Sequence, residues 1–198
     1  MGRHLPRFIC LLRTEPAMRE HLKTERLLLR PCQSADAAAV QTLCTNWKVA
    51  RMTSRIAHPY PAGAAALWIA SHGEARARDE EHTFCIELDG EPVGVVGLRK
   101  TADRVHELGY WIGEPWWGRG YATEAAARLL RFAFRELGAA RLTSGHFLDN
   151  PASGRVLEKC GFAYTGEDSE WSEARGEEVA LRRFELNRET ARELDAAS

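Results

Sequence analysis

The residues best suited to chemistry lie in one glycine-containing segment, Trp117-Gly118-Arg119-Gly120-Tyr121-Ala122-Thr123. Gly118 and Gly120 let the backbone take conformations denied to other residues and come close to a ligand. The segment leads directly into a stretch with helical periodicity, and the free N–H groups of a helix N-terminus attract an anion. Arg119 adds a positive charge and Thr123 a hydroxyl. These features predict a cradle for a pyrophosphate, against the plainer interpretation that the glycines only make a turn.

This segment differs from two well-known phosphate-binding motifs. It lacks the Gly-x-x-x-x-Gly-Lys-Ser/Thr sequence of a P-loop. It also lacks the third glycine of the dinucleotide-binding motif, because Thr123 stands at that position.

A second segment with chemical potential runs from Asn150 to Phe162. Asn150 is placed to cap a short helix, which is its structural interpretation. Its functional interpretation is an amide that hydrogen-bonds an extended, amide-bearing ligand. Ser153 lies in the first turn of the same helix, where a hydroxyl either faces solvent or bonds back to the backbone.

These segments, together with two others, resemble the GNAT superfamily of N-acetyltransferases. The branch that acetylates the N-termini of ribosomal proteins is the most similar. The resemblance extends from about Thr24 to Asn187, and its three motifs occur in the family's order. They are Thr-Glu-Arg-Leu-Leu-Leu-Arg-Pro at 24–31, Leu108-Gly109-Tyr110-Trp111-Ile112 followed by 117–125, and Asn150-x-x-Ser153-x-x-Val156-Leu157-Glu158-Lys159-x-Gly161-Phe162.

The resemblance implies an enzyme that moves the acetyl group of acetyl-CoA directly to a primary amine, with no acyl-enzyme. It assigns the pantetheine amides and the thioester carbonyl to the backbone of Tyr110, Trp111 and Ile112. It places Asn150 beside the pantetheine arm. It assigns the pyrophosphate to the loop residues Trp117, Gly118, Arg119, Gly120, Tyr121, Ala122 and Thr123.

The amine must lose a proton before it can attack, because an α-amine has a pKa of about 8 and a lysine of about 10.4. We expect Glu107 to be the general base. Strand alternation places it on one face with Gly109 and Trp111. Its plainer interpretation is an ordinary strand glutamate. His146 competes for the role, although a lone histidine is more often a packed side chain.

The general acid is less evident from the family pattern. Many members carry a tyrosine in the last helix that protonates the leaving thiolate, and Leu157 stands there in this chain. Trp117 likewise stands where the loop often begins with Gln or Arg. The ribosomal-type branch shares both changes. We expect Ser153 to be the proton donor for the thiolate.

Hydrophobic periodicity predicts an α/β fold. A hairpin meander followed by a strand–helix–strand crossover implies a mixed sheet. The resemblance makes this a mostly antiparallel, twisted GNAT-type sheet of about six or seven strands with helices on both faces. Expected strands span 26–31, 82–88, 92–99, 105–112, 141–148, 162–171 and 177–187, and expected helices span 35–44, 62–78, 121–137 and 152–160; the acidic stretch 167–178 is interpreted as a solvated turn.

Composition limits the function classes. The chain has 198 residues, and 27 Lys and Arg against 28 Asp and Glu give a net charge of −1, so no nucleic-acid partner is expected. No apolar run approaches the roughly 18 residues of a membrane span. Five cysteines, an odd number with no Cys-x-x-Cys spacing, predict reduced thiols, a cytoplasmic location and no metal site. We expect a disordered extension or start-site artefact at 1–20, a single domain at 21–198, and a monomer or homodimer.

The sequence leaves the acceptor open among a protein N-terminus, an amino acid or other small amine, and an aminoglycoside. Two other functions remain as alternatives. One is a CoA-binding sensor or interaction module without useful turnover, supported by the leucine at position 157. The other is a protein that uses the Gly118–Gly120 loop to bind a different phosphate ligand, such as ATP or NAD.

Overall fold

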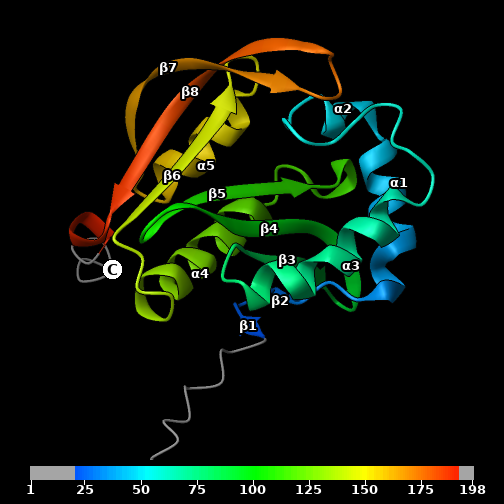
Figure 1. The fold of residues 1–198 in the computed structure, drawn as a ribbon, viewed down its shortest axis with the longest axis horizontal. Helices are drawn as coiled ribbons and strands as arrows, with labels where there is room; N and C mark the ends of the chain where they lie inside the picture. Colours follow the sequence, from blue (N-terminus) through cyan, green and yellow to red (C-terminus); the bar gives the residue numbers. More distant parts are fainter. Residues whose placement is uncertain (1–20, 192–198) are drawn as a thin grey trace, which may run out of the picture.

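The computed structural model describes residues 21–191, so the extension expected at 1–20 lies outside the described residues. Eight strands form one mixed sheet in the order β1-β2-β3-β4-β5-β6-β8-β7 (Figure 1). Its strands are β1 (Leu22–Lys23), β2 (Leu28–Arg30), β3 (Glu81–Leu88), β4 (Glu91–Ala102), β5 (Val105–Ile112), β6 (Arg141–Phe147), β7 (Ala163–Ser172) and β8 (Glu177–Asn187). Its helices are α1 (Ala37–Thr45), α2 (Trp47–Ala50), α3 (Ala64–Ala77), α4 (Tyr121–Arg135) and α5 (Pro151–Lys159), with 3-10 turns at Ser34–Asp36 and Glu114–Trp116.

The predicted fold class is confirmed, with two additions. The short strand β1 raises the strand number above the expected six or seven, and one-turn helix α2 lies in a stretch expected to be irregular. Both are shorter than the window over which hydrophobic periodicity can be recognised. Within residues 21–191, no helix has the length and apolar character needed to cross a membrane.

The sheet opens between β5 and β6. All neighbouring strands pair antiparallel except these two, which run parallel and are joined by the crossover helix α4. They pair only from Val105↔Arg141 to Glu107↔Thr143. Beyond Glu107 the strands diverge into a V (Figure 1), while β5 stays paired with β4 as far as Ile112.

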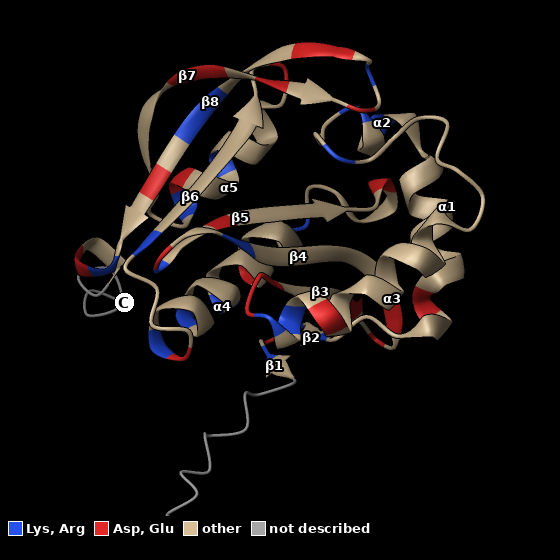
Figure 2. Cartoon of the chain, viewed as in Figure 1, with Lys and Arg blue, Asp and Glu red and all other residues tan. Residues whose placement is uncertain are grey.

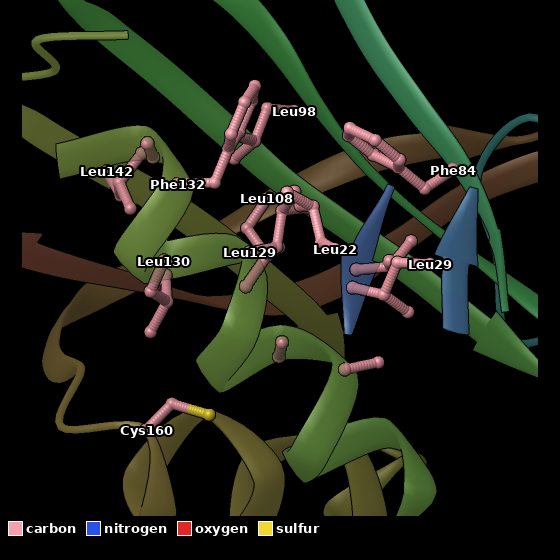
Figure 3. Packing of buried hydrophobic residues seen from close by; sticks show 14 of the residues in the cluster. Leu22, Leu29, Phe84, Leu98, Leu108, Leu129, Leu130, Phe132, Leu142 and Cys160 are labelled. Carbon is pink, nitrogen blue, oxygen red and sulfur yellow. The ribbon is translucent and has the colours of Figure 1, made fainter. Parts of the chain in front are cut away.

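The main core lies between the sheet and helix α4. One face of α4 is buried, and its Leu129 and Phe132 pack near Leu98 and Leu108 of the sheet (Figure 3). Phe132 also meets Phe84 edge to face, with ring centroids 5.7 Å apart. A smaller cluster on the other side joins α1 and α3 through Val40, Cys44, Ala65 and Ile69, with Trp68 and Trp111 against it. Helices therefore cover both faces, as predicted.

A buried ion pair fixes the start of α1. Arg30 at the end of β2 donates two hydrogen bonds to Asp36, at 2.7 and 2.9 Å. The backbone N–H of Gln33 donates to the same carboxylate at 2.7 Å. Burial by itself would raise the pKa of Asp36, but these donors outweigh burial and hold that pKa below its usual value. The pair sets the position of the helices on the Trp111 side of the sheet.

The acidic stretch 167–178 is not a turn, so that prediction was wrong. Strand β7 continues to Ser172 and β8 begins at Glu177, which leaves only 173–176 as the turn. The acidic side chains of β7 are paired with arginines of β8. Glu167 pairs with Arg182 at 3.4 Å, and Glu170 pairs with Arg183 at 3.3 Å. Opposite charges facing each other on neighbouring strands stabilise a hairpin that composition alone would describe as a loop.

Helix α5 packs closely on His146 of β6. A Cβ added at Gly154 would lie 2.7 Å from His146 Nε2. We therefore expect Gly154→Ala to lower the free energy of unfolding by roughly 1–3 kcal/mol through overpacking. Gly73→Ala in α3 is the matched control, because nothing lies within 4 Å of a Cβ there, and it should stabilise by about 0.5–1 kcal/mol. Urea denaturation followed by tryptophan fluorescence measures both, and equal stability of Gly154→Ala and the unmodified protein would contradict the close packing.

Candidate active site

The V between β5 and β6 opens into a cavity of about 850 Å³. Strand β5, the loop 116–120, the start of α4, the first turns of α5 and the segment 52–56 all contribute to its lining. The volume is within the range of pockets that hold a cofactor or a drug-sized ligand. The cavity therefore brings together the glycine segment and the Asn150 segment, which are distant in the sequence.

The edge of β5 that faces the V offers backbone groups to a ligand. In an antiparallel pair the backbone groups of successive residues point alternately toward the partner strand and away from it. The carbonyl of Leu108 accepts a 2.9 Å hydrogen bond from Ser144 Oγ on β6, and that of Ile112 accepts a 2.6 Å bond from Trp117 Nε1. The same alternation directs the N–H groups of Tyr110 and Ile112 into the V. An extended chain with amide groups can bind there as an added strand would.

The same alternation means that the backbone N–H of Trp111, unlike those of Tyr110 and Ile112, does not point into the V. Its backbone is directed toward β4, and its side chain lies on the opposite side of the sheet from α4, against Val40 and Cys44 of α1. Trp111 therefore lines the cavity through its indole ring.

The glycine segment takes the backbone conformation expected of an anion cradle. Gly118 and Gly120 have φ angles of +74° and +82°, which favour glycine. Helix α4 begins at Tyr121, and no side chain caps it at Gly120, so the N–H groups of its first turn remain for a ligand. Gly118, Gly120, Tyr121, Ala122 and Thr123 line the cavity, together with Trp117. The predicted residue Arg119 is not part of the lining.

A strap from the N-terminal strands holds this loop in place, and sequence reasoning missed it. Arg26 donates to the carbonyl of Arg119 at 3.0 Å and to Glu124 Oε2 at 2.7 Å. Thr24 Oγ1 donates to Glu124 Oε1 at 2.6 Å, and the Arg26 guanidinium lies 4.7 Å from the centre of the Tyr121 ring. Partial burial alone would raise the pKa of Glu124, but these hydrogen bonds outweigh it and keep the pKa below its usual value.

The Asn150 segment forms the wall opposite β5. Asn150 caps α5, its amide oxygen accepting the N–H of Ser153 at 3.3 Å, so the structural interpretation holds. Asn150 is also one of the residues that line the cavity. Arg155 and Lys159, four residues apart on α5, line the cavity too. Sequence reasoning missed these two, although a basic pair at helical spacing was the available signal.

Ser153 is joined to a residue that sequence reasoning had assigned only through its backbone. The hydroxyl oxygens of Tyr110 and Ser153 lie 2.8 Å apart, and Tyr110 Oη also donates to the Ser153 carbonyl at 3.1 Å. Burial raises the pKa of Tyr110 well above its usual value, outweighing the opposite effect of the bond to Ser153. The phenol therefore stays protonated near neutral pH.

Glu107 lines the cavity on the Trp111 side. Its carboxylate is paired with Arg99 across the β4–β5 ladder, and with Arg183 of β8 at 3.6 Å. The other residue considered as a base, His146, is 9 % exposed, with its Nδ1 2.9 Å from the carbonyl oxygen of Phe147 and its ring tilted on Phe184. Leu157 is fully buried in the main core, so the position that carries the tyrosine in many relatives does not face the cavity here.

A family model described as the acetyltransferase (GNAT) domain matches residues 26–163. The chain is 30% identical over 154 residues to YoaA of Bacillus subtilis, an uncharacterised N-acetyltransferase, and this match covers 73% of the chain and 84% of YoaA. The chain belongs to the GNAT acetyltransferase family.

Two solved GNAT structures are similar in fold. RimJ of Mycobacterium smegmatis, in complex with CoA-disulfide, has a TM-score of 0.76 at 24% identity, covering 89% of this chain and 92% of that chain. A spermidine N-acetyltransferase of Vibrio cholerae, in complex with CoA and spermine, has a TM-score of 0.71 at 21% identity, covering 84% and 98%. The predicted GNAT resemblance, including the ribosomal-protein branch among its neighbours, is thus confirmed.

In this acetyltransferase a roof spans the open end of the V. The N–H of Glu173, in the β7–β8 turn, donates to the carbonyl of Ser54 at 2.9 Å. Arg175 of the same turn donates to the carbonyl of Arg51 at 2.8 Å and to Asp149 at 2.9 Å. Figure 1 shows the hairpin reaching over the V toward α2. These contacts enclose the cavity on the side where Glu107 and Trp111 lie.

Proposed function

We propose that the protein transfers the acetyl group of acetyl-CoA directly to a primary amine, with general-base assistance and no acyl-enzyme. The observation that carries this proposal is the single cavity in which the free edge of β5 meets the uncapped start of α4. One feature suits the amides of a pantetheine chain and the other a pyrophosphate.

The cofactor roles follow from this arrangement. The N–H groups of Tyr110 and Ile112 bind the pantetheine amides and polarise the thioester carbonyl. The loop from Trp117 to Thr123 binds the pyrophosphate, and the NH2 group of the Asn150 side-chain amide faces the pantetheine arm. Arg155 and Lys159 add positive charge on α5. The indole of Trp111 serves the acceptor instead.

The catalytic steps use groups on both sides of the V. Glu107 accepts the proton from the acceptor ammonium, and the neutral amine then attacks the thioester carbonyl. Backbone N–H groups of β5 stabilise the resulting oxyanion. As the carbon–sulfur bond breaks, the attacking nitrogen loses its second proton to solvent, and the Ser153 hydroxyl gives its proton to the thiolate. Ser153 regains a proton from the phenol of Tyr110, solvent returns one to Tyr110, and Glu107 releases to solvent the proton that it accepted.

Acetyl-CoA should stabilise the protein against heat. A ligand at about 100 times its Kd adds roughly 2.7 kcal/mol to the free energy of unfolding, which is a rise of roughly 5–10 °C in Tm for a domain of this size. A thermal shift measurement with ATP and NAD as controls checks this. An unchanged Tm at saturating acetyl-CoA would refute both the pyrophosphate cradle and the role assigned to Asn150. A rise in Tm with ATP or NAD alone would favour the nucleotide-binding alternative.

The strap should set the affinity for acetyl-CoA without touching it. Because Arg26 fixes the carbonyl of Arg119, we expect Arg26→Ala to raise the Kd of acetyl-CoA about tenfold, which is about 1.4 kcal/mol. Arg131→Ala is the matched control, since it removes one charge from an exposed position of α4. Isothermal titration calorimetry measures both. An unchanged Kd in Arg26→Ala would show that the loop keeps its conformation without the strap.

The two proton-transfer residues should affect turnover and not cofactor affinity. We expect Glu107→Gln to lower kcat by about 10²-fold and Ser153→Ala to lower it by about 10-fold, with the Kd of acetyl-CoA preserved. Glu91→Gln, at an exposed position of β4, is the control for loss of a carboxylate. Release of the CoA thiol reports the rate. Full activity of either variant would end the role proposed for that residue.

A further inference from the structure

The charged residues that line the acceptor side of the cavity are paired with residues of opposite charge. Glu81, Arg99 and Glu107 form one row across three neighbouring strands, because Glu81 pairs with Arg99 in the β3–β4 register and Arg99 with Glu107 in the β4–β5 register. The other charged residues on this side are Arg55, Asp149, Glu170 and Arg183, and Asp149 is paired with Arg51 and Arg175 of the roof. Figure 2 shows the acidic segments of β7 and the basic segment of the neighbouring strand β8.

Each of these glutamates already has an arginine partner. Glu81 lies 3.7 Å from Arg55, Glu107 is paired with Arg99, and Glu170 lies 3.3 Å from Arg183. An acceptor with several positive charges would have to separate these pairs and leave the arginines without a counter-charge in a partly enclosed cavity. The wall therefore does not suit a polyamine or an aminoglycoside.

Arg183 is the arginine best placed to meet an anionic group on the acceptor. Its side chain extends from β8 toward β5 beside Gly145 of β6, where an added Cβ would lie 3.6 Å from Nη1. It approaches Glu107 at 3.6 Å and Asp168 and Glu170 at 3.3 Å each. Charge-assisted hydrogen bonds are typically 2.7–2.9 Å. The guanidinium is shared loosely among three carboxylates, and a planar carboxylate ligand can compete for its fork.

The floor next to this charged row is formed by two glycines beside Thr83. Gly97 and Gly109 face each other in the β4–β5 register. They lie two residues along their strands from Arg99 and Glu107, and therefore on the same face of the sheet. Nothing lies within 4 Å of a Cβ placed at Gly109. Beyond this floor the lining becomes apolar, with Ile56, Tyr60, Trp68 and Trp111. A ligand lying on the floor would meet paired charges at one end and aromatic side chains at the other.

We propose that the acceptor is an α-amino acid with an apolar or aromatic side chain, an inference that rests on the proposed function. Its amine lies at Glu107 and its carboxylate at Arg183. Glu107 Oε1 and Arg183 Nη1 lie 3.6 Å apart. An amine and a carboxylate attached to one carbon can therefore reach both side chains. The ligand's two charges replace the contact between Glu107 and Arg183, so every charge keeps a partner. Its side chain lies over Gly109 against Trp111.

The first experiment compares acceptors that differ in one group. Phenylalanine, phenylalaninamide, phenethylamine, serine and spermidine are offered with acetyl-CoA, and thiol release is measured. We expect kcat/KM for phenylalanine to exceed that of each other amine by at least about tenfold, since the site is left with unpaired charge by the amide, the decarboxylated amine and the polyamine. Serine, which has a small polar side chain, tests whether the site requires an apolar side chain on the acceptor.

The second experiment removes the carboxylate partner. We expect Arg183→Gln to lower kcat/KM for phenylalanine at least about tenfold more than it lowers kcat/KM for phenethylamine, because only phenylalanine has the carboxylate. Arg182→Gln is the matched control, since Arg182 pairs with Glu167 and its guanidinium lies 5.9 Å from the Tyr164 ring, away from the cavity. Arg183→Lys serves as a second variant if Arg183→Gln does not bind acetyl-CoA as the unmodified protein does.

Three outcomes would overturn the amino-acid acceptor while leaving the proposed function intact. They are spermidine or phenethylamine matching phenylalanine, Arg183 variants affecting all amines equally, and acetyl-CoA binding with no turnover of phenylalanine. Serine matching phenylalanine would overturn the apolar side chain. Absence of acetyl-CoA binding by calorimetry would instead refute both proposals.

Discussion

The separation of β5 from β6 after three residue pairs is the constraint on which the rest of the structure depends. Unpaired backbone groups inside a protein are unfavourable unless they find other partners. Here β4 and β8 hold the outer edges of the two strands, so the sheet survives the gap. Ser144 and Trp117 satisfy two of the carbonyls exposed by it. What remains is a row of donors held rigidly by the sheet, which a ligand can complete.

Successive side chains of β5 point to opposite faces of the sheet, so the two faces carry different groups. Leu108 and Ile112 turn toward α4 and join the main core, so the helix that provides the anion cradle is fixed to the strand that provides the amide donors. Glu107, Gly109 and Trp111 turn to the other face, where the α1–α3 side and the hairpin roof enclose them. In the proposed mechanism, β5 therefore presents its free backbone edge to the donor's thioester and one of its faces to the acceptor's amine.

Local signals predicted much of this structure. The period of α4, the glycines before it and the cap at Asn150 are all short-range features, and each appears in the structure. Contacts between distant segments were missed. Arg26 reaches Glu124 across 98 residues, and Tyr110 reaches Ser153 across 43. The acidic stretch 167–178 was misjudged for the same reason, since its compensating arginines lie on the partner strand.

The roof over the V is built from segments that take no part in the cradle. Its contacts join the β7–β8 turn to the loop after α2, and both lie outside the stretch from β4 to α5 that we propose binds acetyl-CoA. Exchanging the turn 173–176 for one of another length would reshape the acceptor entrance and leave the stretch from β4 to α5 intact. The fold thus separates the segments that we propose bind acetyl-CoA from the loops that form the acceptor entrance. The range of acceptors in such a fold can therefore change by loop exchange alone.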